Sequence, residues 1–427
     1  MRLRSNPRIQ SFLSNDITKA VTALVGANLF TAIVGMAGSF IQGVFVTAEE
    51  LGFFKQFSII TYYLFFLHFG SFHAIERLYP YYKGKNEGEK AYEVVELGSS
   101  WVILICLLIT IVFSVLTVVS FVKGDWKSGI CWIVQIVVIW TSLYGGFLQA
   151  TYRSGKEFQS MAKASYLHPF LSLVTIPLYW VQPFVTMAIR SCTSLATTIR
   201  LHMKRPVKVG FRLDIKGFFK LFSEGFPLFT ASYINSTGLD AIRGSIILFF
   251  LTQADLGLWS FAFQLLIIVF MLPSAVTSIY APRVIEKFSA TKSVDEAMKV
   301  AKEPIKIGLL LSLLIVPVGS ILTYLLLPRF LPNYAGSTMI FIVLLLATPF
   351  KLSDIYSSVL SATRNRRLLN AVALMGTATQ VLVAIVGVLL GFGVISFAIS
   401  FFMGYVVRAI SYLFMIRKVS YSYKSSK

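Results

Sequence analysis

The sequence contains few of the residues with which soluble enzymes build metal and catalytic sites. Its 427 residues include only three cysteines, four histidines and 19 acidic residues, against 39 lysines and arginines. The cysteines, Cys106, Cys131 and Cys192, form no CxxC pair and have no histidine at metal-ligand spacing. We therefore expect them to be small buried residues, and we predict no metal site, no cofactor and no catalytic residue.

Two further absences narrow the range of functions. The nearest match to a phosphate-binding GxxxxGK[ST] loop, at residues 153–157, lacks the first glycine and the hydroxyl residue, so ATP hydrolysis is not expected. The loops on the predicted outer side are also short, the longest being 327–336. We therefore expect no folded domain on that side.

Long apolar runs make up most of the remaining sequence, whose mean hydropathy is +0.73. A helix needs ~20 predominantly apolar residues to cross a bilayer. Twelve runs come near that length, which predicts an all-α polytopic membrane protein with about twelve transmembrane helices. The predicted spans are 20–42, 56–76, 97–121, 129–150, 166–181, 184–203, 226–250, 258–280, 305–327, 337–360, 368–390 and 395–416.

Basic residues lie almost entirely on one side of these spans. Of the 39 lysines and arginines, 31 precede the first span, lie in alternate loops or at the span ends next to them, or lie in the C-terminal tail, and four lie deeper within the spans. The other side holds only Lys55, Lys123, Lys127 and Arg329. The positive-inside rule then places both termini in the cytoplasm. Topology and contact with lipid headgroups explain the net charge of +20, so we expect no nucleic-acid partner.

The sequence also carries a weak internal repeat. FVTAEELGFF (45–54) matches FLTQADLGLW (250–259) with an offset of 205 residues, and the most basic loop, 200–220, separates the two halves. Duplication predicts two six-helix lobes related by a pseudo-two-fold axis along the membrane normal, around a central cavity. The predicted parts are an N-lobe (1–203), a basic cytoplasmic linker (204–220) and a C-lobe (221–427).

Four stretches of the sequence carry a resemblance to a known family. They are LGFFKQFSIITYYLFFLHFGSFHAIERLYPYYKGKNEGEKA (51–91), GFPLFTASYINSTGLDAIRGSIILFF (225–250), LPNYAGST (331–338) and SSVLSATRNRRLLNAV (357–372). In these stretches and their order, the chain resembles the Wzx-type polysaccharide flippases of the multidrug/oligosaccharidyl-lipid/polysaccharide exporter (MOP) superfamily, which have a MATE-like fold. The resemblance covers nearly the whole chain. The family has no invariant catalytic motif to transfer, so cargo-binding residues have to be sought in this sequence.

The resemblance implies a transporter and not an enzyme. The expected cargo is an undecaprenyl-diphosphate-linked oligosaccharide, one of the polyprenyl-diphosphate carriers of O-antigen and other surface polysaccharides. The two lobes would move it from the cytoplasmic to the outer leaflet of a bacterial inner (plasma) membrane by alternating access. The resemblance also implies polysaccharide polymerase and chain-length proteins as partners; a polymerase or ligase itself would need a larger outer loop.

A multidrug exporter of the same superfamily is the alternative function. Such an exporter binds cations and therefore needs acidic and aromatic residues in its cavity. Away from the ends of the predicted spans, basic side chains outnumber acidic ones by 4 to 2. This excess favours an anionic cargo, and the outward movement of an anion from a negative-inside cell would run downhill by ~2.3 kcal/mol per charge per 100 mV.

Charged residues inside the spans are the candidate cargo-binding residues, because an ionised side chain near mid-bilayer costs ~2.5–3.5 kcal/mol and needs a partner, water or a task. Asp240 and Arg243 lie in one polar turn together with Asn235, Ser236 and Thr237. Arginine offers phosphate oxygens a planar, always-charged fork. The spacing of three residues also allows Asp240 and Arg243 to neutralise each other and only hold helices together, which is the alternative interpretation.

Four more charged residues join this group of candidates. Lys351 and Asp354 repeat the spacing of three nearer the cytoplasmic end, where Lys351 could also snorkel to the interface. Arg190 and Arg408 have no acidic residue within one helical turn, which suits an anionic ligand. Arg190 could instead reach outer headgroups, and Arg408 could pair with Asp354 or Asp240 across the cavity.

Two smaller sets complete the candidates. Five arginines at the cytoplasmic mouth could gather a diphosphate from the leaflet, although the positive-inside rule alone also explains them. They are Arg77, Arg283, Arg364, Arg366 and Arg367. His68 and His73 are five residues apart and so share no helix face, which argues against a metal pair. Such histidines are more often hydrogen-bonded cavity residues, and a proton relay is the alternative interpretation.

Overall fold

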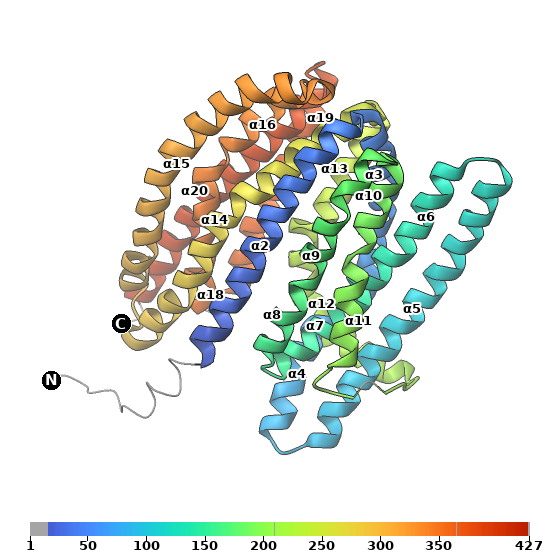
Figure 1. Cartoon of the computed structure of the whole chain (residues 1–427). Helices are drawn as coiled ribbons and strands as arrows, with labels where there is room; N and C mark the ends of the chain where they lie inside the picture. Colours follow the sequence, from blue (N-terminus) through green and yellow to red (C-terminus); the bar gives the residue numbers. More distant parts are fainter. Residues whose placement is uncertain (1–15, 209, 364, 426–427) are drawn as a thin grey trace. The chain divides into compact units, whose positions relative to one another are not determined.

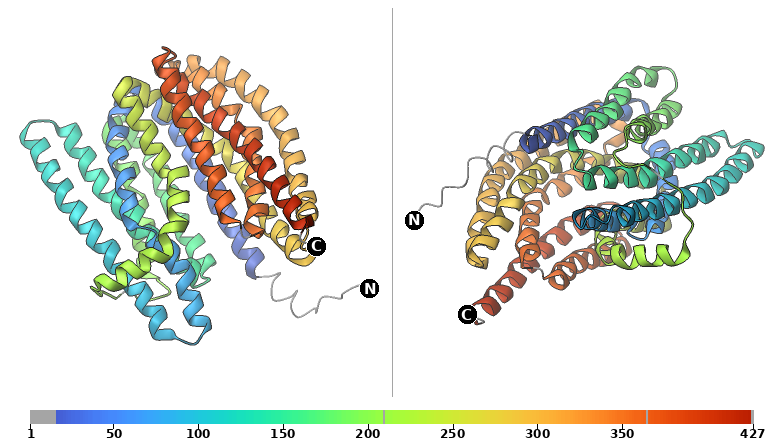
Figure 2. Two further views of the ribbon diagram at one scale, coloured as in Figure 1. Left: turned by 180° about the vertical axis from the view of Figure 1, so that it is seen from behind. Right: turned by 90° about the horizontal axis from the view of Figure 1, so that it is seen from below.

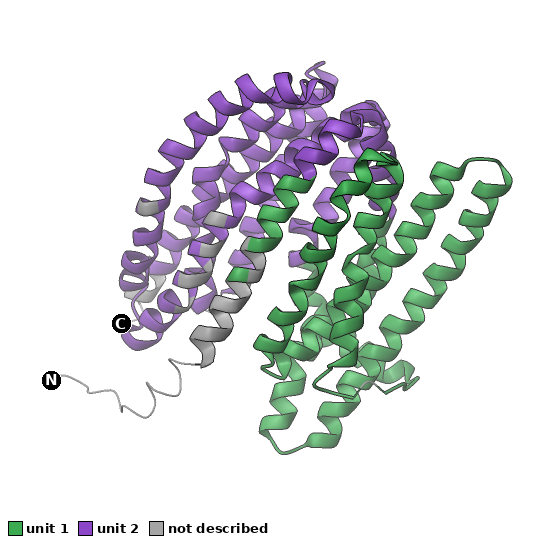
Figure 3. Ribbon diagram, viewed as in Figure 1, with its two compact units in different colours: residues 1–38, 61–230 green, residues 39–60, 231–427 purple. Residues whose placement is uncertain are grey.

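The computed structural model describes residues 16–208, 210–363 and 365–425, which fold into helices joined by short turns, with no strand. Packing divides the chain into two compact units (Figure 3). Unit 1 comprises Met1–Gly38 and Thr61–Thr230, and unit 2 comprises Ser39–Ile60 and Ala231–Lys427. Three helices contribute to both units: α2 (Asp16–Phe45), α3 (Ala48–Leu64) and α12 (Ile215–Asn235).

Unit 1 is built from a long helical hairpin and several shorter helices (Figure 1). In the hairpin, α5 (Gly88–Val122) packs against α6 (Trp126–Ile139). The turn between them needs Gly124, whose φ is 78°, and Asp125, whose carboxylate accepts a hydrogen bond from the backbone N–H of Ser128. The other helices are η1 (Phe65–His68), α4 (Ser71–Gly84), η2 (Trp140–Tyr144), α7 (Gly145–Ser154), α8 (Phe158–Ser165), α9 (Leu167–Val174), η3 (Ile176–Trp180), α10 (Pro183–Cys192) and α11 (Ser194–Met203).

Unit 2 is a bundle of longer helices (Figure 2). α14 (Gln253–Thr291) packs against α15 (Val294–Phe330), and α19 (Arg366–Leu389) packs against α20 (Ile395–Ser425). A capping box formed by Thr252 and Asp255 starts α14. The remaining helices are α13 (Thr237–Phe250), η4 (Pro332–Tyr334), α16 (Ser337–Leu345), α17 (Thr348–Lys351), η5 (Leu352–Asp354) and α18 (Ile355–Ala362).

The outer faces of these helices are apolar, as a bilayer requires. Val118 and Val122 on α5 and Leu310, Leu313 and Leu314 on α15 are all well exposed. Seven helices in the described part are long and apolar enough to cross a membrane, and the bent pair Ser337–Leu345 and Thr348–Ala362 would make eight. Only helices and closed barrels satisfy their backbone hydrogen bonds in lipid. The predicted fold class, an all-α polytopic membrane protein, is confirmed.

Several predicted spans are broken helices and not single rods. Spans 166–181, 184–203 and 226–250 coincide with helix pairs that a turn interrupts, namely α9 with η3, α10 with α11, and α12 with α13. The second span is interrupted where Phe69 and Gly70 both take positive φ values, 46° and 79°. Interruptions at membrane depth place polar backbone inside the protein, and they often mark binding sites in transporters.

The two copies of the sequence repeat contact each other within unit 2. A Cβ added at Gly52 would collide with the carbonyl oxygen of Gln253, and one added at Gly257 would collide with that of Ala48. Gly52 and Gly257 occupy equivalent positions of the repeat, and so do Ala48 and Gln253. The two contacts are therefore equivalent, and the pairing is reciprocal. The Gln253 side-chain amide also donates to the Gln56 amide oxygen at 2.9 Å. This reciprocity supports duplication, while the lobe boundaries stay a prediction.

Candidate functional site

The polar turn predicted at residues 235–243 lies at the break between α12 and α13. Ser236, the residue between the two helices, has φ −129° and ψ −102°, outside the helical region. The side-chain oxygen of Asn235 accepts hydrogen bonds from Thr377 Oγ1 at 2.8 Å and from Arg408 Nη2 at 3.3 Å. The break therefore places an amide where it binds residues from α19 and α20.

Arg243 is the most deeply buried cation of this group. Its side chain is 5% exposed, and its guanidinium donates to Asp240 Oδ1 at 2.5 Å and to Gln380 Oε1 at 2.8 Å. The guanidinium carbon also lies over three aromatic rings, at 5.2–5.7 Å from the centroids of Trp259, Phe263 and Phe401. A carboxylate, an amide and an aromatic cage thus neutralise Arg243 within unit 2.

Arg408 and Lys351 both lie near the ring of Tyr405. The Tyr405 ring centroid is 5.1 Å from the Arg408 guanidinium carbon and 5.8 Å from Lys351 Nζ. Lys351 forms an ion pair with Asp354 at 2.7 Å. Arg408 is hydrogen-bonded to Asn235, and its buried Nε has no acceptor in the described part of the chain. The suggested pairing of Arg408 with Asp240 or Asp354 is therefore not what this structure shows.

Two glycines leave room for the buried polar side chains between α19 and α20. A Cβ at Gly376 of α19 would lie 3.0 Å from Arg408 Nε, and one at Gly404 of α20 would collide with the Gln380 side chain. The two helices therefore approach closely where their polar side chains cross. Unit 2 brings together five of the six predicted intramembrane residues, with three cations and two carboxylates: Asp240, Arg243, Lys351, Asp354 and Arg408.

Arg190, the sixth residue, lies on α10 of unit 1. Its Nε donates to Ser172 Oγ at 2.8 Å and its Nη2 to the carbonyl oxygen of Val34 at 3.3 Å. Nη1 is buried and has no hydrogen-bond partner among the described residues. Gly38 leaves room for the guanidinium, since a Cβ there would overlap it. No carboxylate of the described chain forms an ion pair with Arg190, so its charge is solvated by neutral oxygens alone.

The arginines predicted at the cytoplasmic mouth have separate surroundings. Arg77 forms an exposed ion pair with Glu224 at 3.0 Å, and Arg283 lies 5.2 Å from the ring centroid of Tyr280. Arg367 is exposed. Arg364 and the side chain of Arg366 lie outside the described residues.

Sequence reasoning missed the neutral residues of the Arg243 surroundings. Gln380 is 2% exposed, and it is a polar residue inside a predicted span, which could have marked it. The aromatic cage gave no such signal, because the chain has 37 phenylalanines and most serve general packing. Only the fold shows which three rings surround the guanidinium.

Comparisons with known proteins support the fold. No protein-family model and no curated protein matches the sequence. Solved structures do match: an inward-facing multidrug resistance MATE family transporter of the MOP superfamily has a TM-score of 0.71 and 14% identity, over 93% of this chain and 96% of that one. The lipid II flippase MurJ in an inward closed conformation has a TM-score of 0.70 and 14% identity, over 92% and 87%.

A third similar structure is described as having a binding pocket of reverse polarity. It is a MOP superfamily transporter from Pyrococcus furiosus, with a TM-score of 0.60 and 16% identity over 99% of each chain. At these identities the likeness concerns the fold. The protein is a multi-pass membrane protein with the fold of MOP superfamily transporters.

Proposed function

We propose that the protein is a flippase that moves a polyprenyl-diphosphate-linked oligosaccharide from the cytoplasmic to the outer leaflet, for the synthesis of a surface polysaccharide. The fold shared with the lipid II flippase MurJ supports a lipid-linked cargo. The excess of intramembrane cations supports an anionic one. An undecaprenyl diphosphate carrier in a bacterial inner membrane, with both termini cytoplasmic, fits these features.

The observation that carries the proposal is the unneutralised guanidinium of Arg190. A cation at membrane depth is costly, and the Arg190 guanidinium is surrounded by neutral groups of the described chain, among them the Ser172 hydroxyl, the Val34 carbonyl and the Tyr179 hydroxyl. Its buried Nη1 hydrogens are left without an acceptor in the described chain. A diphosphate oxygen would supply both the missing acceptor and the missing negative charge.

The unit 2 group has a different part in this proposal. Arg408 has one hydrogen bond to an amide oxygen and a free buried Nε, so it is the residue there with spare capacity for an anion. Arg243, Lys351 and their carboxylates already form two ion pairs. In this proposal the two ion pairs hold the helices around Arg408 in place. The cargo contacts only those polar groups that the pairs leave without a partner.

The aromatic cage bears on the alternative function, a cation exporter. Trp259, Phe263 and Phe401 are the kind of cage that binds organic cations, but Arg243 already occupies it. An internal cation in that position excludes an external one. Under the flippase proposal, a cationic probe such as tetraphenylphosphonium should bind only after Arg243→Ala empties the cage. Under the exporter function, the native protein would already bind the probe, and Arg243→Ala would not bind it more tightly.

The proposal is tested first in the host and then in liposomes. Deleting the gene should cause lipid-linked oligosaccharide to accumulate in the membrane while the surface glycan is lost. Unchanged glycan with new sensitivity to cationic drugs would establish the exporter instead. In liposomes, Arg190→Ala should slow flipping of the lipid-linked substrate at least about tenfold. The matched control Lys123→Ala, which removes an exposed charge from the α5–α6 turn, should leave the rate unchanged.

A further inference from the structure

The break between η1 and α4 in unit 1 creates a buried polar region that the proposed cargo site does not use. Phe69 and Gly70 both have left-handed backbone conformations there, and a Cβ at Gly70 would collide with the backbone of Gly225 on α12. Within six residues, three buried side-chain atoms have no hydrogen-bond partner in the described chain. They are His68 Nε2, Ser71 Oγ and His73 Nδ1.

His68 is fixed as a neutral donor at this break. It is 1% exposed, its Nδ1 accepts a hydrogen bond from the Gly70 N–H at 3.1 Å, and its ring stacks on Phe72 with 4.0 Å between centroids. Because Nδ1 already accepts, the ring hydrogen resides on Nε2. Protonating His68 would require breaking the bond to Gly70, so His68 is poorly placed to take up a proton.

His73 differs from His68, because no hydrogen bond within the described chain fixes its Nδ1. Its buried Nδ1 has no partner in the described chain, so one of its ring nitrogens is free to change its protonation. Its ring centroid lies 6.1 Å from that of Phe229, and the Phe229 centroid lies 4.1 Å from that of His68. One helical turn further along α4 is the carboxylate of Glu76, which points toward α7.

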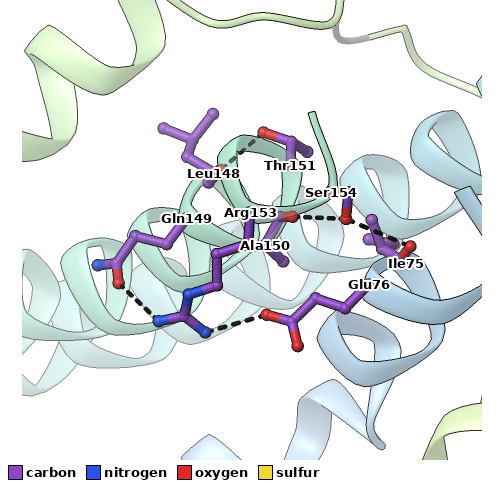
Figure 4. Close-up of polar contacts among 8 residues, drawn as sticks. All are labelled: Ile75, Glu76, Leu148, Gln149, Ala150, Thr151, Arg153 and Ser154. Carbon is purple, nitrogen blue, oxygen red and sulfur yellow. Dashed lines mark hydrogen bonds and ion pairs between the residues drawn. The ribbon is translucent and has the colours of Figure 1, made fainter. Parts of the chain in front are cut away.

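Glu76 forms the ion pair that connects α4 to α7 (Figure 4). Arg153 Nη1 of α7 donates to Glu76 Oε1 at 3.0 Å, while its Nη2 donates to Gln149 at 3.4 Å. A weaker contact runs from Ser154 Oγ to the Ile75 carbonyl oxygen at 3.4 Å. This ion pair is exposed and adds a polar contact to an apolar interface, in which Gly146 of α7 packs against the ring of Phe72 on α4.

Two carboxylates on the helices packed against α4 are paired with arginines and not with His73. Glu224 of α12 is paired with Arg77, and Glu93 of α5 is paired with Arg212 at 3.3 Å. The charges that act on His73 are accordingly Glu76 on its own helix and Arg153 on α7. These two groups act in opposite directions, since the carboxylate stabilises an imidazolium and the guanidinium destabilises it.

We propose that His73 is a proton-binding site that weakens the Glu76–Arg153 ion pair between α4 and α7 when it is charged. A proton from solution joins the free ring nitrogen and forms one N–H bond, which gives an imidazolium and transfers no electrons. The new charge attracts Glu76 and repels Arg153, so it weakens the ion pair between the two helices. The consequence for transport, that α4 and α7 separate more easily when His73 is charged, rests on the proposed function; the proton site itself does not.

Histidine-selective ¹⁵N spectra of the full-length protein test the site directly. The chain has four histidines, so each ring is assigned by its own substitution to glutamine. The signals of the ring assigned to His73 should change from those of a neutral imidazole to those of an imidazolium as the pH is lowered. Glu76→Gln should move its midpoint to lower pH and Arg153→Gln to higher pH. A His73 ring that stays neutral down to pH 5, or a midpoint that neither variant moves, would overturn the site.

Distances between spin labels test the effect on the helices. Labels at the exposed positions Tyr81, on α4, and Lys156, just after α7, should give a broader distance distribution at pH 5 than at pH 8. His73→Gln should keep the narrow distribution at both values, and Glu76→Gln should give the broad one at both. A pH-dependent change that survives in His73→Gln would refute the control by His73. Neither measurement needs a cargo, so failure of the flippase proposal would leave both results intact.

Discussion

Arg190 in unit 1 and Arg243 in unit 2 are both arginines inside predicted membrane spans, but their surroundings are opposite. Arg243 has a carboxylate, an amide oxygen and three aromatic rings around its guanidinium. Arg190 has a hydroxyl and a backbone carbonyl. Protein groups therefore compensate the desolvation of Arg243, whereas they compensate the desolvation of Arg190 only in part. Residue type alone therefore does not identify a ligand-binding cation; the balance of nearby charge does.

The comparison predicts that breaking the Asp240–Arg243 pair has the largest effect on stability. Asp240→Ala leaves the guanidinium of Arg243 buried without a counter-ion, and we expect a loss of about 3 kcal/mol in the free energy of unfolding. Chemical unfolding in detergent measures it. The double variant Asp240→Ala/Arg243→Ala should recover part of the loss. If the single and the double variant lose the same unfolding free energy, Asp240 does not act as the counter-ion of Arg243.

Arg190→Ala should act on transport and not on folding. Losing charge-assisted hydrogen bonds to a diphosphate, about 1.5–3 kcal/mol, corresponds to a rate of flipping roughly 10- to 150-fold lower at low substrate concentration. Arg190→Lys keeps the charge and should retain part of the rate. Unfolding free energies within about 1 kcal/mol of the native value are expected. A strongly destabilised Arg190→Ala protein would mean that Arg190 is structural after all.

Gln380→Ala sharpens the description of how Arg243 is neutralised. The substitution removes the acceptor of Nη2 in a buried place, so we expect about 1–2 kcal/mol of destabilisation. Gln380→Glu, which keeps an acceptor at that position, is the matched control and should be tolerated better. If both variants unfold alike, packing around Gln380 matters more than its hydrogen bond to Arg243.

Lys351→Met should have the smallest effect. The side chains of Lys351 and Asp354 are 21% and 23% exposed, so solvent and lipid headgroups can stabilise either charge when the other is removed. We expect a change below about 1 kcal/mol in unfolding free energy, as for other accessible ion pairs. The same unfolding assay applies, with Asp354→Asn as the partner variant. A cost as large as that of Asp240→Ala would make the two ion pairs equivalent.

The fold class followed from the sequence because hydrophobic length and the distribution of basic charge depend on local composition. The contact between Asp240 and Arg243 could also be predicted, since residues three apart share a helix face. The partners from distant helices could not be predicted. Gln380 is 137 positions from Arg243, and an apolar helix carries no sequence pattern that shows which of its faces points inward.

Helix interruptions were hidden for a related reason. The positive φ values at Phe69 and Gly70 interrupt a run that is apolar enough to be taken for one continuous span. Gly70 is a weak signal by itself, because isolated glycines also occur inside transmembrane helices. The histidines on either side of the break were noticed in the sequence, but only the structure shows that one accepts from Gly70 while the other keeps a free nitrogen.

The reciprocal contact of Gly52 and Gly257 has a consequence for the origin of the chain. Each copy of the repeat supplies both a glycine and the carbonyl oxygen that approaches the other glycine. A surface of this kind is self-complementary, as in the isologous interfaces of two-fold symmetric dimers. A half-length ancestor with a single copy would already carry both sides of the contact. Fusion of two such genes would then make a pre-existing homodimer interface permanent and let its two sides diverge, Glu50 and Asp255 being one such pair.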